Sequence, residues 1–227
     1  MIFPLSAEEF WDDRELINPK HTAIIVIDMQ NDTCKNASPL GRSGWDLSFV
    51  EEMAPELAKF LSSIRKLGYT VVHTRNEHSY HTNSGVRLRQ ARKSDWPRFA
   101  EPSSKGADWY DKFNEFIPLS NEPIITKHRY SAFVGTDLAQ ILRAKAIRTI
   151  VLTGVETHIC VESTARSAFM EDFHVILISN CTATQVSPDQ RISPKTMHEV
   201  ATEIIDEYFG TVMTSDKFLK LAIPSSK

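Results

Sequence analysis

Short, mostly apolar runs alternate with amphipathic stretches along this chain, and the alternation predicts its architecture. The runs are too short for helices and rich in β-branched side chains, which is typical of strands. Residues 22–27 (Thr-Ala-Ile-Ile-Val-Ile) lack polar alternation, as expected of a strand buried on both faces. The predicted strands are residues 22–27, 70–74, 123–127, 148–152, 174–178 and 210–214.

The amphipathic stretches carry apolar residues at helical spacing. The clearest has Leu57, Leu61 and Ile64 on one face and stops at Gly68. The predicted helices cover residues 49–67, 136–144, 159–170 and 195–208. Strands that alternate with helices in this way need right-handed crossovers, so we expect an α/β fold built on one parallel sheet.

The length of 227 residues suits one domain spanning residues 1–227. Residues 1–20 contain an amphipathic piece over 7–17, which is predicted to be an N-terminal arm or a helix that packs on the domain or on a partner subunit. Residues 75–120 are polar and irregular, and loops this long in a compact domain are usually functional. We therefore predict that they form an insert that shapes a substrate pocket.

Composition and charge narrow the class of protein. The chain is 41% hydrophobic and 24% charged, which is ordinary for a soluble globular protein. A net charge of −3 gives no electrostatic reason to expect nucleic acid or an anionic membrane as partner. No apolar run approaches the ~20 residues that span a bilayer, and the early acidic residues do not fit a secretory signal. The 3 cysteines, without close pairing, argue against a disulfide framework, so a cytoplasmic protein is expected.

Three reactive residues stand at the carboxyl ends of predicted strands: Asp28, Lys127 and Cys160. Such strand ends meet at one crevice in an open α/β sheet, so we expect these side chains to converge. Cys160 also falls where a helix begins, and unpaired N–H groups there favour a thiolate. The alternatives are structural. Asp28 could cap the following loop, and Cys160 could be a small buried thiol that packs.

Together these three groups could attack a carbonyl carbon. The thiol is the nucleophile, the carboxylate takes its proton and later activates water, and the ammonium orients both groups. The backbone N–H groups of Glu156 and Cys160 could stabilise the oxyanion.

Three blocks, residues 25–31, 127–133 and 153–166, resemble the signature sequences of the isochorismatase-like cysteine hydrolases, in the order and spacing of that family. The resemblance implies a Rossmann-like, three-layer α/β/α fold with a mainly parallel six-stranded sheet. It also implies an Asp–Lys–Cys catalytic triad at Asp28, Lys127 and Cys160. A cis peptide bond between Val155 and Glu156 and a homodimeric or homotetrameric assembly are further implications.

Departures from the family's patterns refine the expected chemistry. The nicotinamidase branch has a metal-binding Asp-x-His motif, whereas residues 32–60 here contain no histidine, so neither metal nor cofactor is expected. Isochorismatases that cleave a vinyl ether lack the cysteine, so Cys160 favours hydrolysis of a C–N bond. The last two blocks look most like those of the N-carbamoylsarcosine, ureidoacrylate and biuret amidohydrolases. This implies a small-molecule amide, carbamoyl or ureide substrate and a thioester-type acyl-enzyme.

The residues expected to line the substrate pocket are Gln30, Asn31, Tyr130, Phe133, Glu156 and His158. Glu156 replaces a small or hydroxyl residue of the family, and its side chain either faces the pocket or points away from it. The basic segment 87–98 either attracts a substrate carboxylate or is a solvated face. A vinyl-ether hydrolase and a non-catalytic family member are the alternative functions.

Overall fold

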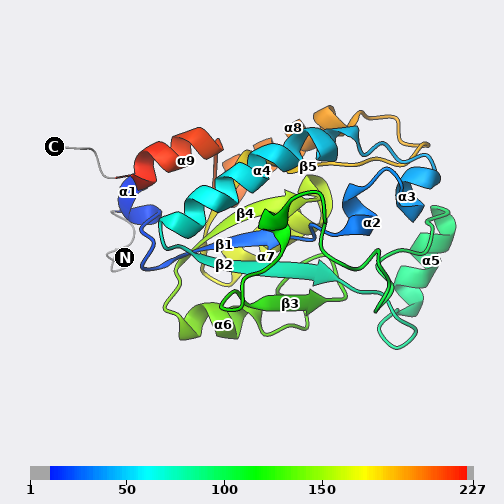
Figure 1. Ribbon diagram of the computed structural model, residues 1–227, viewed down its shortest axis with the longest axis horizontal. Coiled ribbons are helices and arrows are strands. Elements are labelled where there is room, and N and C mark those ends of the chain that lie inside the picture. The colour runs from blue at the N-terminus through cyan, green and yellow to red at the C-terminus, as the bar shows by residue number, and fades with distance from the viewer. Residues whose placement is uncertain (1–10, 224–227) are drawn as a thin grey trace, which may run out of the picture.

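The computed structural model describes residues 11–223, and its centre is a six-stranded sheet (Figure 1). The strands are β1 (Thr22–Ile27), β2 (Thr70–Asn76), β3 (Ile124–Lys127), β4 (Thr149–Val155), β5 (His174–Ala183) and β6 (Thr211–Met213). They lie in the order β3-β2-β1-β4-β5-β6, and every neighbouring pair is parallel. The predicted α/β fold and its strands are confirmed.

Helices cover both faces of the sheet (Figure 1). One face carries α4 (Ser48–Lys66), α9 (Ser215–Ala222) and the short α1 (Asp13–Leu16). The other carries α6 (Leu138–Ala144), α7 (Glu162–Met170) and α8 (Pro194–Tyr208). Within residues 11–223, no helix combines the length and the apolar character that a bilayer crossing requires.

The two hydrophobic cores explain why the central strands lack polar alternation. Ile24 and Val26 of β1 belong to the core beneath α4, whereas Ile25 and Ile27 belong to the core beneath α6 and α7. Successive side chains of a strand point to opposite faces. Because both faces of β1 are covered, all of its residues are buried.

The amphipathic piece predicted over residues 7–17 lies only partly within the described residues, and there it forms a short helix. Residues 1–10 lie outside the described residues, and α1 contains four residues. The Asp12 side chain caps it by accepting hydrogen bonds from the N–H groups of Arg14 and Glu15.

The insert between β2 and β3 contains more structure than predicted. A helix, α5 (Gly85–Lys93), and a 3₁₀ turn, η2 (Asn114–Phe116), lie within it. The α5 helix begins where Ser84 accepts a hydrogen bond from Arg87 N–H, and it buries none of its residues. Without an apolar stripe, α5 gives no helical period in the sequence. Two short helices, α2 (Asn31–Cys34) and α3 (Pro39–Arg42), likewise occupy the loop predicted after β1.

Hydrogen bonds connect the insert to the segment that follows β1. The Gln30 side chain donates to the carbonyl oxygens of Asn76 and Ala107 at 3.1 and 2.8 Å and accepts from the Asn76 N–H. Asp32 accepts a hydrogen bond from the Ala100 N–H at 2.7 Å. The end of β1 and the insert are therefore tied together.

Gly154 allows β4 to approach β1 near the carboxyl edge, and we predict that Gly154→Ala destabilises the fold. Gly154 has φ +97°, and an added Cβ would collide with the backbone of Ile27. Both the left-handed conformation and the rigid neighbour oppose a side chain. We expect the free energy of unfolding to fall by at least about 2 kcal/mol.

Gly68→Ala is the control, measured with Gly154→Ala by denaturant unfolding. Gly68 also has a positive φ, +78°, but an added Cβ there meets nothing within 4 Å. This variant should lose about 1 kcal/mol from backbone strain alone. Equal losses in the two variants would contradict a steric role for Gly154.

Candidate active site

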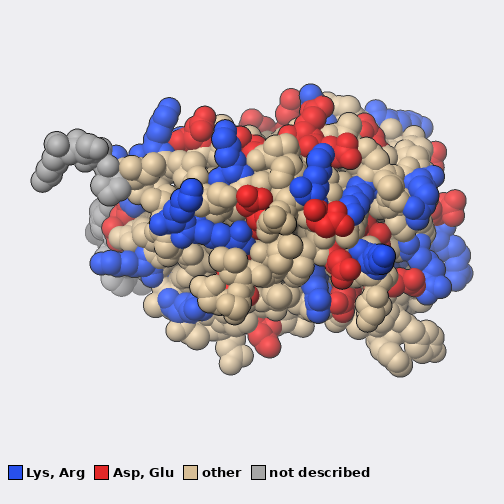
Figure 2. Space-filling model, viewed as in Figure 1, with Lys and Arg blue, Asp and Glu red and all other residues tan. Residues whose placement is uncertain are grey.

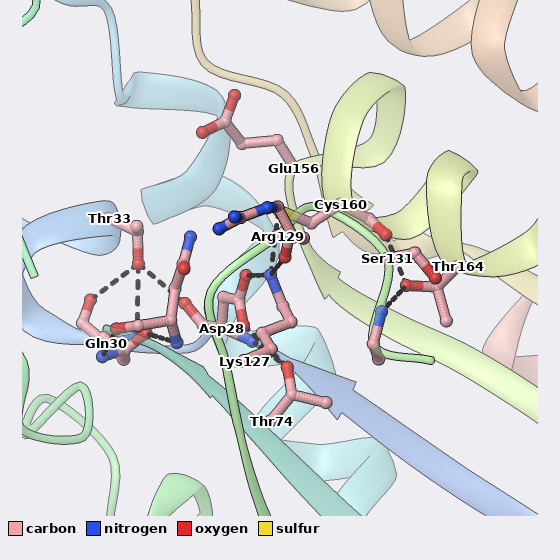
Figure 3. A network of polar contacts seen from close by, with 12 residues as sticks. Asp28, Gln30, Thr33, Thr74, Lys127, Arg129, Ser131, Glu156, Cys160 and Thr164 are labelled. Atoms are coloured by element: carbon pink, nitrogen blue, oxygen red, sulfur yellow. Dashed lines mark hydrogen bonds and ion pairs between the residues drawn. The ribbon is translucent and has the colours of Figure 1, made fainter. Parts of the chain in front are cut away.

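Asp28, Lys127 and Cys160 meet at the carboxyl edge of the sheet (Figure 3). Asp28 directly follows β1, Lys127 ends β3, and Cys160 lies in a π-helical turn, η3 (Thr157–Val161), after β4. Lys127 Nζ lies 2.6 Å from Asp28 Oδ2 and 3.3 Å from Cys160 Sγ. The structure thus brings together the three residues that the sequence places at strand ends.

Thr74, in β2, holds the Asp28 carboxylate in place. Its hydroxyl donates a hydrogen bond of 2.6 Å to Asp28 Oδ1, and its carbonyl accepts from the Asp28 N–H at 3.2 Å. Asp28 has a left-handed backbone, φ 52°, a conformation that Asp tolerates better than most residues. Sequence reasoning missed Thr74 because a threonine in a strand needs no special explanation.

Lys127 is completely buried and uses its ammonium donors within the site. Besides its contacts with Asp28 and Cys160, it donates a hydrogen bond of 3.2 Å to the Arg129 carbonyl oxygen. Burial opposes its charge, but attraction to Asp28 and Cys160 outweighs this and raises the pKa of the Lys127 ammonium. Lys127 is therefore a fixed cation at physiological pH.

The surroundings of Cys160 favour the protonated thiol, contrary to the expected thiolate. Burial raises the pKa of Cys160 most strongly, Lys127 opposes that rise, and the carboxylates of Asp28 and Glu156 add to it. The expectation relied on an α-helical N-terminus, whereas η3 precedes the α-helix α7 at this point. In the free protein, therefore, the thiol keeps its proton next to a carboxylate that can accept it.

The segment leading to Cys160 carries Glu156, and the Val155–Glu156 peptide bond is cis. In Figure 3 the Glu156 carboxylate points away from Lys127, and its Oε1 accepts a hydrogen bond from the Gln185 side chain. Burial raises the pKa of Glu156 to about 7. Glu156 nevertheless lines the cavity above Cys160. Of the two directions considered for its side chain, the one that faces the pocket is therefore found.

A cavity of about 40 Å³ opens above the three reactive residues. Asp28 and Cys160 form part of its floor, and Tyr130 and Glu156 are the two predicted pocket residues that line it. Its walls also contain His78, one of the histidines that the sequence suggests as pocket residues, and Arg87 from the basic segment. The wall residues that sequence reasoning did not select come from the end of β2, the loop after β1 and the insert: Leu40, Trp45, Asn76, Trp96 and Phe99. So small a cavity favours a small ligand.

The remaining predicted pocket residues lie elsewhere. Gln30 donates a hydrogen bond to the insert at the Ala107 carbonyl oxygen. The Asn31 side chain donates to the Lys105 carbonyl oxygen and accepts from the Asp111 N–H, and it lines a separate polar groove. Phe133 packs on Phe173, with ring centres 5.7 Å apart, in the core under α6 and α7. His158 does not line the cavity, and burial lowers its pKa to about 4.

His73 lies within β2, and its side chain has a carboxylate partner. His73 Nε2 lies 3.0 Å from Glu122 Oε2, and the same carboxylate also forms an ion pair with Arg65. Across residues 11–223, no group of three or more His, Cys, Asp or Glu side chains is arranged to hold a metal ion.

Comparison with known proteins adds evidence of relationship. The family model described as the isochorismatase domain matches residues 22–217. A ureidoacrylate amidohydrolase of Caulobacter vibrioides is 30% identical over 89% of this chain and 91% of its own, and one of Serratia proteamaculans is 28% identical over 92% and 86%.

Among solved structures, a cysteine hydrolase of Pseudomonas syringae superimposes with a TM-score of 0.77 at 25% identity, covering 91% of this chain and 94% of its own. An N-carbamoylsarcosine amidase of Thermoplasma acidophilum does so with a TM-score of 0.65 at 26% identity, covering 86% and 97%.

Lys127→Met should raise the pH at which Cys160 is alkylated, because Lys127 is the group that lowers the thiol pKa. The variant also leaves the Asp28 carboxylate buried without its partner, so we expect the free energy of unfolding to fall by about 3–5 kcal/mol. Measuring the alkylation rate of Cys160 against pH by mass spectrometry tests the first effect, and denaturant unfolding tests the second.

Lys35→Met provides the control, because Lys35 pairs with Asp111 at the surface at 2.7 Å. Losing an exposed pair costs about 0–1 kcal/mol and leaves the Cys160 profile unchanged. An unchanged profile in Lys127→Met as well would remove Lys127 from control of the thiol.

Any hydrolytic activity should survive exhaustive chelation, since the described histidines and carboxylates do not converge as metal ligands do. The measurement is turnover before and after treatment with EDTA. Loss of turnover that zinc or iron restores would contradict this prediction.

Proposed function

Because the chain belongs to the isochorismatase family of cysteine hydrolases, we propose that it cleaves a C–N bond of a small amide, carbamoyl or ureido compound through a thioester. The observation that carries the proposal is the contact of Lys127 with both Asp28 and Cys160, which form part of the floor of one small cavity. A thiol next to a buried carboxylate and a fixed cation is suited to nucleophilic catalysis.

The first step in this proposal is acylation. Cys160 Sγ attacks the carbonyl carbon as its proton passes to the Asp28 carboxylate. The backbone N–H groups of Glu156 and Cys160 stabilise the oxyanion. Asp28 then protonates the leaving nitrogen, which departs as ammonia or an amine while the acyl group stays on sulfur.

Deacylation reverses the proton movement. Asp28, again a carboxylate, takes a proton from water that attacks the thioester, and Cys160 regains a proton as the acid leaves. Lys127 keeps its proton throughout, because its pKa is raised, and its charge stabilises the thiolate each time that ion forms. The role of Lys127 is therefore electrostatic and positional.

The related amidohydrolases support this substrate class. Relatives that match over most of both chains act on ureidoacrylate, and a similar structure is an N-carbamoylsarcosine amidase. We therefore place the activity among the small amides and ureides, with a homodimeric or homotetrameric enzyme as the expected assembly and the cytoplasm as the expected location.

The decisive experiment is an ammonia-release screen over simple amides, nicotinamide, biuret, ureidoacrylate and N-carbamoyl amino acids. Cys160→Ala should lower turnover of any active compound by at least about 10³-fold while leaving the fold intact, as checked by circular dichroism. Cys181→Ala is the matched control, since Cys181 is a buried thiol outside the cavity.

Two outcomes would contradict the proposal. An active enzyme that is unaffected by Cys160→Ala would favour the vinyl-ether hydrolase. Inertness toward the whole panel, with Cys160 labelled by iodoacetamide no faster than Cys34 or Cys181, would favour a non-catalytic member of the family.

A further inference from the structure

One wall of the active-site cavity separates it from a larger groove on the outer side of the insert. His78, Arg87, Trp96 and Phe99 line both spaces. The outer groove measures about 990 Å³, against about 40 Å³ for the cavity. A ligand whose carbonyl lies at Cys160 therefore has its other end close to these four side chains.

Arg87 is the charged member of this wall that lacks a counter-ion. Its Nη1 donates a hydrogen bond of 3.0 Å to Asn83 Oδ1, and its guanidinium lies 5.8 Å from the centre of the Phe99 ring. No carboxylate of residues 11–223 forms an ion pair with it. A half-buried guanidinium has lost water without gaining an anion, so a bound anion would find its donors available.

The local electrostatics favour an anion at this wall. Burial, followed by repulsion from Arg87, Lys127, His128 and Arg129, lowers the pKa of His78 to about 3. Figure 2 shows Lys and Arg side chains gathered over α5 at the same end of the molecule. Burial is the larger cause of this shift, and the repulsion by nearby cationic groups that adds to it means that the local potential is positive.

The carboxylates of the cavity do not cancel this potential. Asp28 is paired with Lys127 at 2.6 Å. Glu156, which directly follows β4 and lines the cavity, has a pKa of about 7 and is partly neutral at physiological pH. Tyr130, Cys160 and Arg87 all line this one cavity of about 40 Å³, so its two ends are close together.

We propose that Arg87 binds a carboxylate of the substrate, which makes the substrate class small amides, carbamoyl or ureido compounds that carry a carboxylate a few bonds from the scissile C–N bond. This rests on the proposed function. The proposal assigns this role to Arg87 alone among the basic residues of the segment, because Arg89, Arg92 and Lys93 do not line the cavity.

Two alkylating reagents of nearly equal size test the proposal without knowledge of the substrate. Iodoacetate carries a carboxylate, iodoacetamide is its neutral counterpart, and both alkylate the same sulfur. The ratio of their rate constants at Cys160, measured by mass spectrometry, therefore cancels changes in thiol reactivity and reports on recognition of the anion.

Arg87→Met should lower the iodoacetate-to-iodoacetamide ratio by at least about tenfold, the size expected for a lost charge-assisted hydrogen bond. Arg87→Lys should keep part of the preference. Arg89→Met, which removes an exposed charge from the same helix, should leave the ratio within about twofold of wild type. An unchanged ratio in Arg87→Met, or an equal fall in Arg89→Met, would overturn the proposal.

A second measurement applies if neither reagent labels Cys160. N-carbamoylglycine and the neutral propylurea are titrated against wild type and Arg87→Met, and binding is followed by calorimetry. A preference of at least about tenfold for the carboxylate compound that disappears in the variant supports the proposal, and no preference in wild type refutes it. An Arg87-dependent preference in a protein that is inert toward the whole amide and ureide panel would count against the hydrolase and keep the anion site.

Discussion

The buried ion pair between Lys127 and Asp28 is the constraint on which the site depends. Removing two charges from water is costly, and a buried pair persists only where the remaining hydrogen-bonding groups are also satisfied. Here Thr74 bonds the carboxylate, and the Arg129 carbonyl oxygen and Cys160 Sγ receive the ammonium. β1, β2, β3 and the turn after β4 must therefore all be correctly positioned for these contacts to form.

The strand order brings these groups together. From β1 to β3 the chain adds strands on one side of β1, and from β4 onward it adds them on the other side. The switch point lies between β1 and β4, and a crevice forms at such a point in an open parallel sheet. Asp28 and Cys160 follow the two strands that flank the switch, and Lys127 reaches across from β3. The same order permits helices on both faces, which is why the ion pair is sealed from water beneath the cavity.

The outer wall of the cavity and the buried ion pair come from different parts of the chain. The reactive groups come from the sheet edge, whereas Arg87, Trp96 and Phe99 come from the insert. The hydrogen bonds of Gln30 and Asp32 tie that insert to the end of β1. These hydrogen bonds therefore hold the cavity wall in a fixed position relative to Asp28.

The sequence by itself determined the alternation of strands and helices, because burial on both faces leaves an uninterrupted apolar signature in each central strand. It also placed Asp28, Lys127 and Cys160 at strand ends, since charged or reactive residues stand out against such runs. Tertiary structure alone decided the structural use of Gln30 and Asn31, the direction of Glu156, the protonation of Cys160 and the position of Arg87 on the cavity wall. Each of these depends on contacts between segments far apart in the chain, and on the burial that those contacts create, so no local pattern records them.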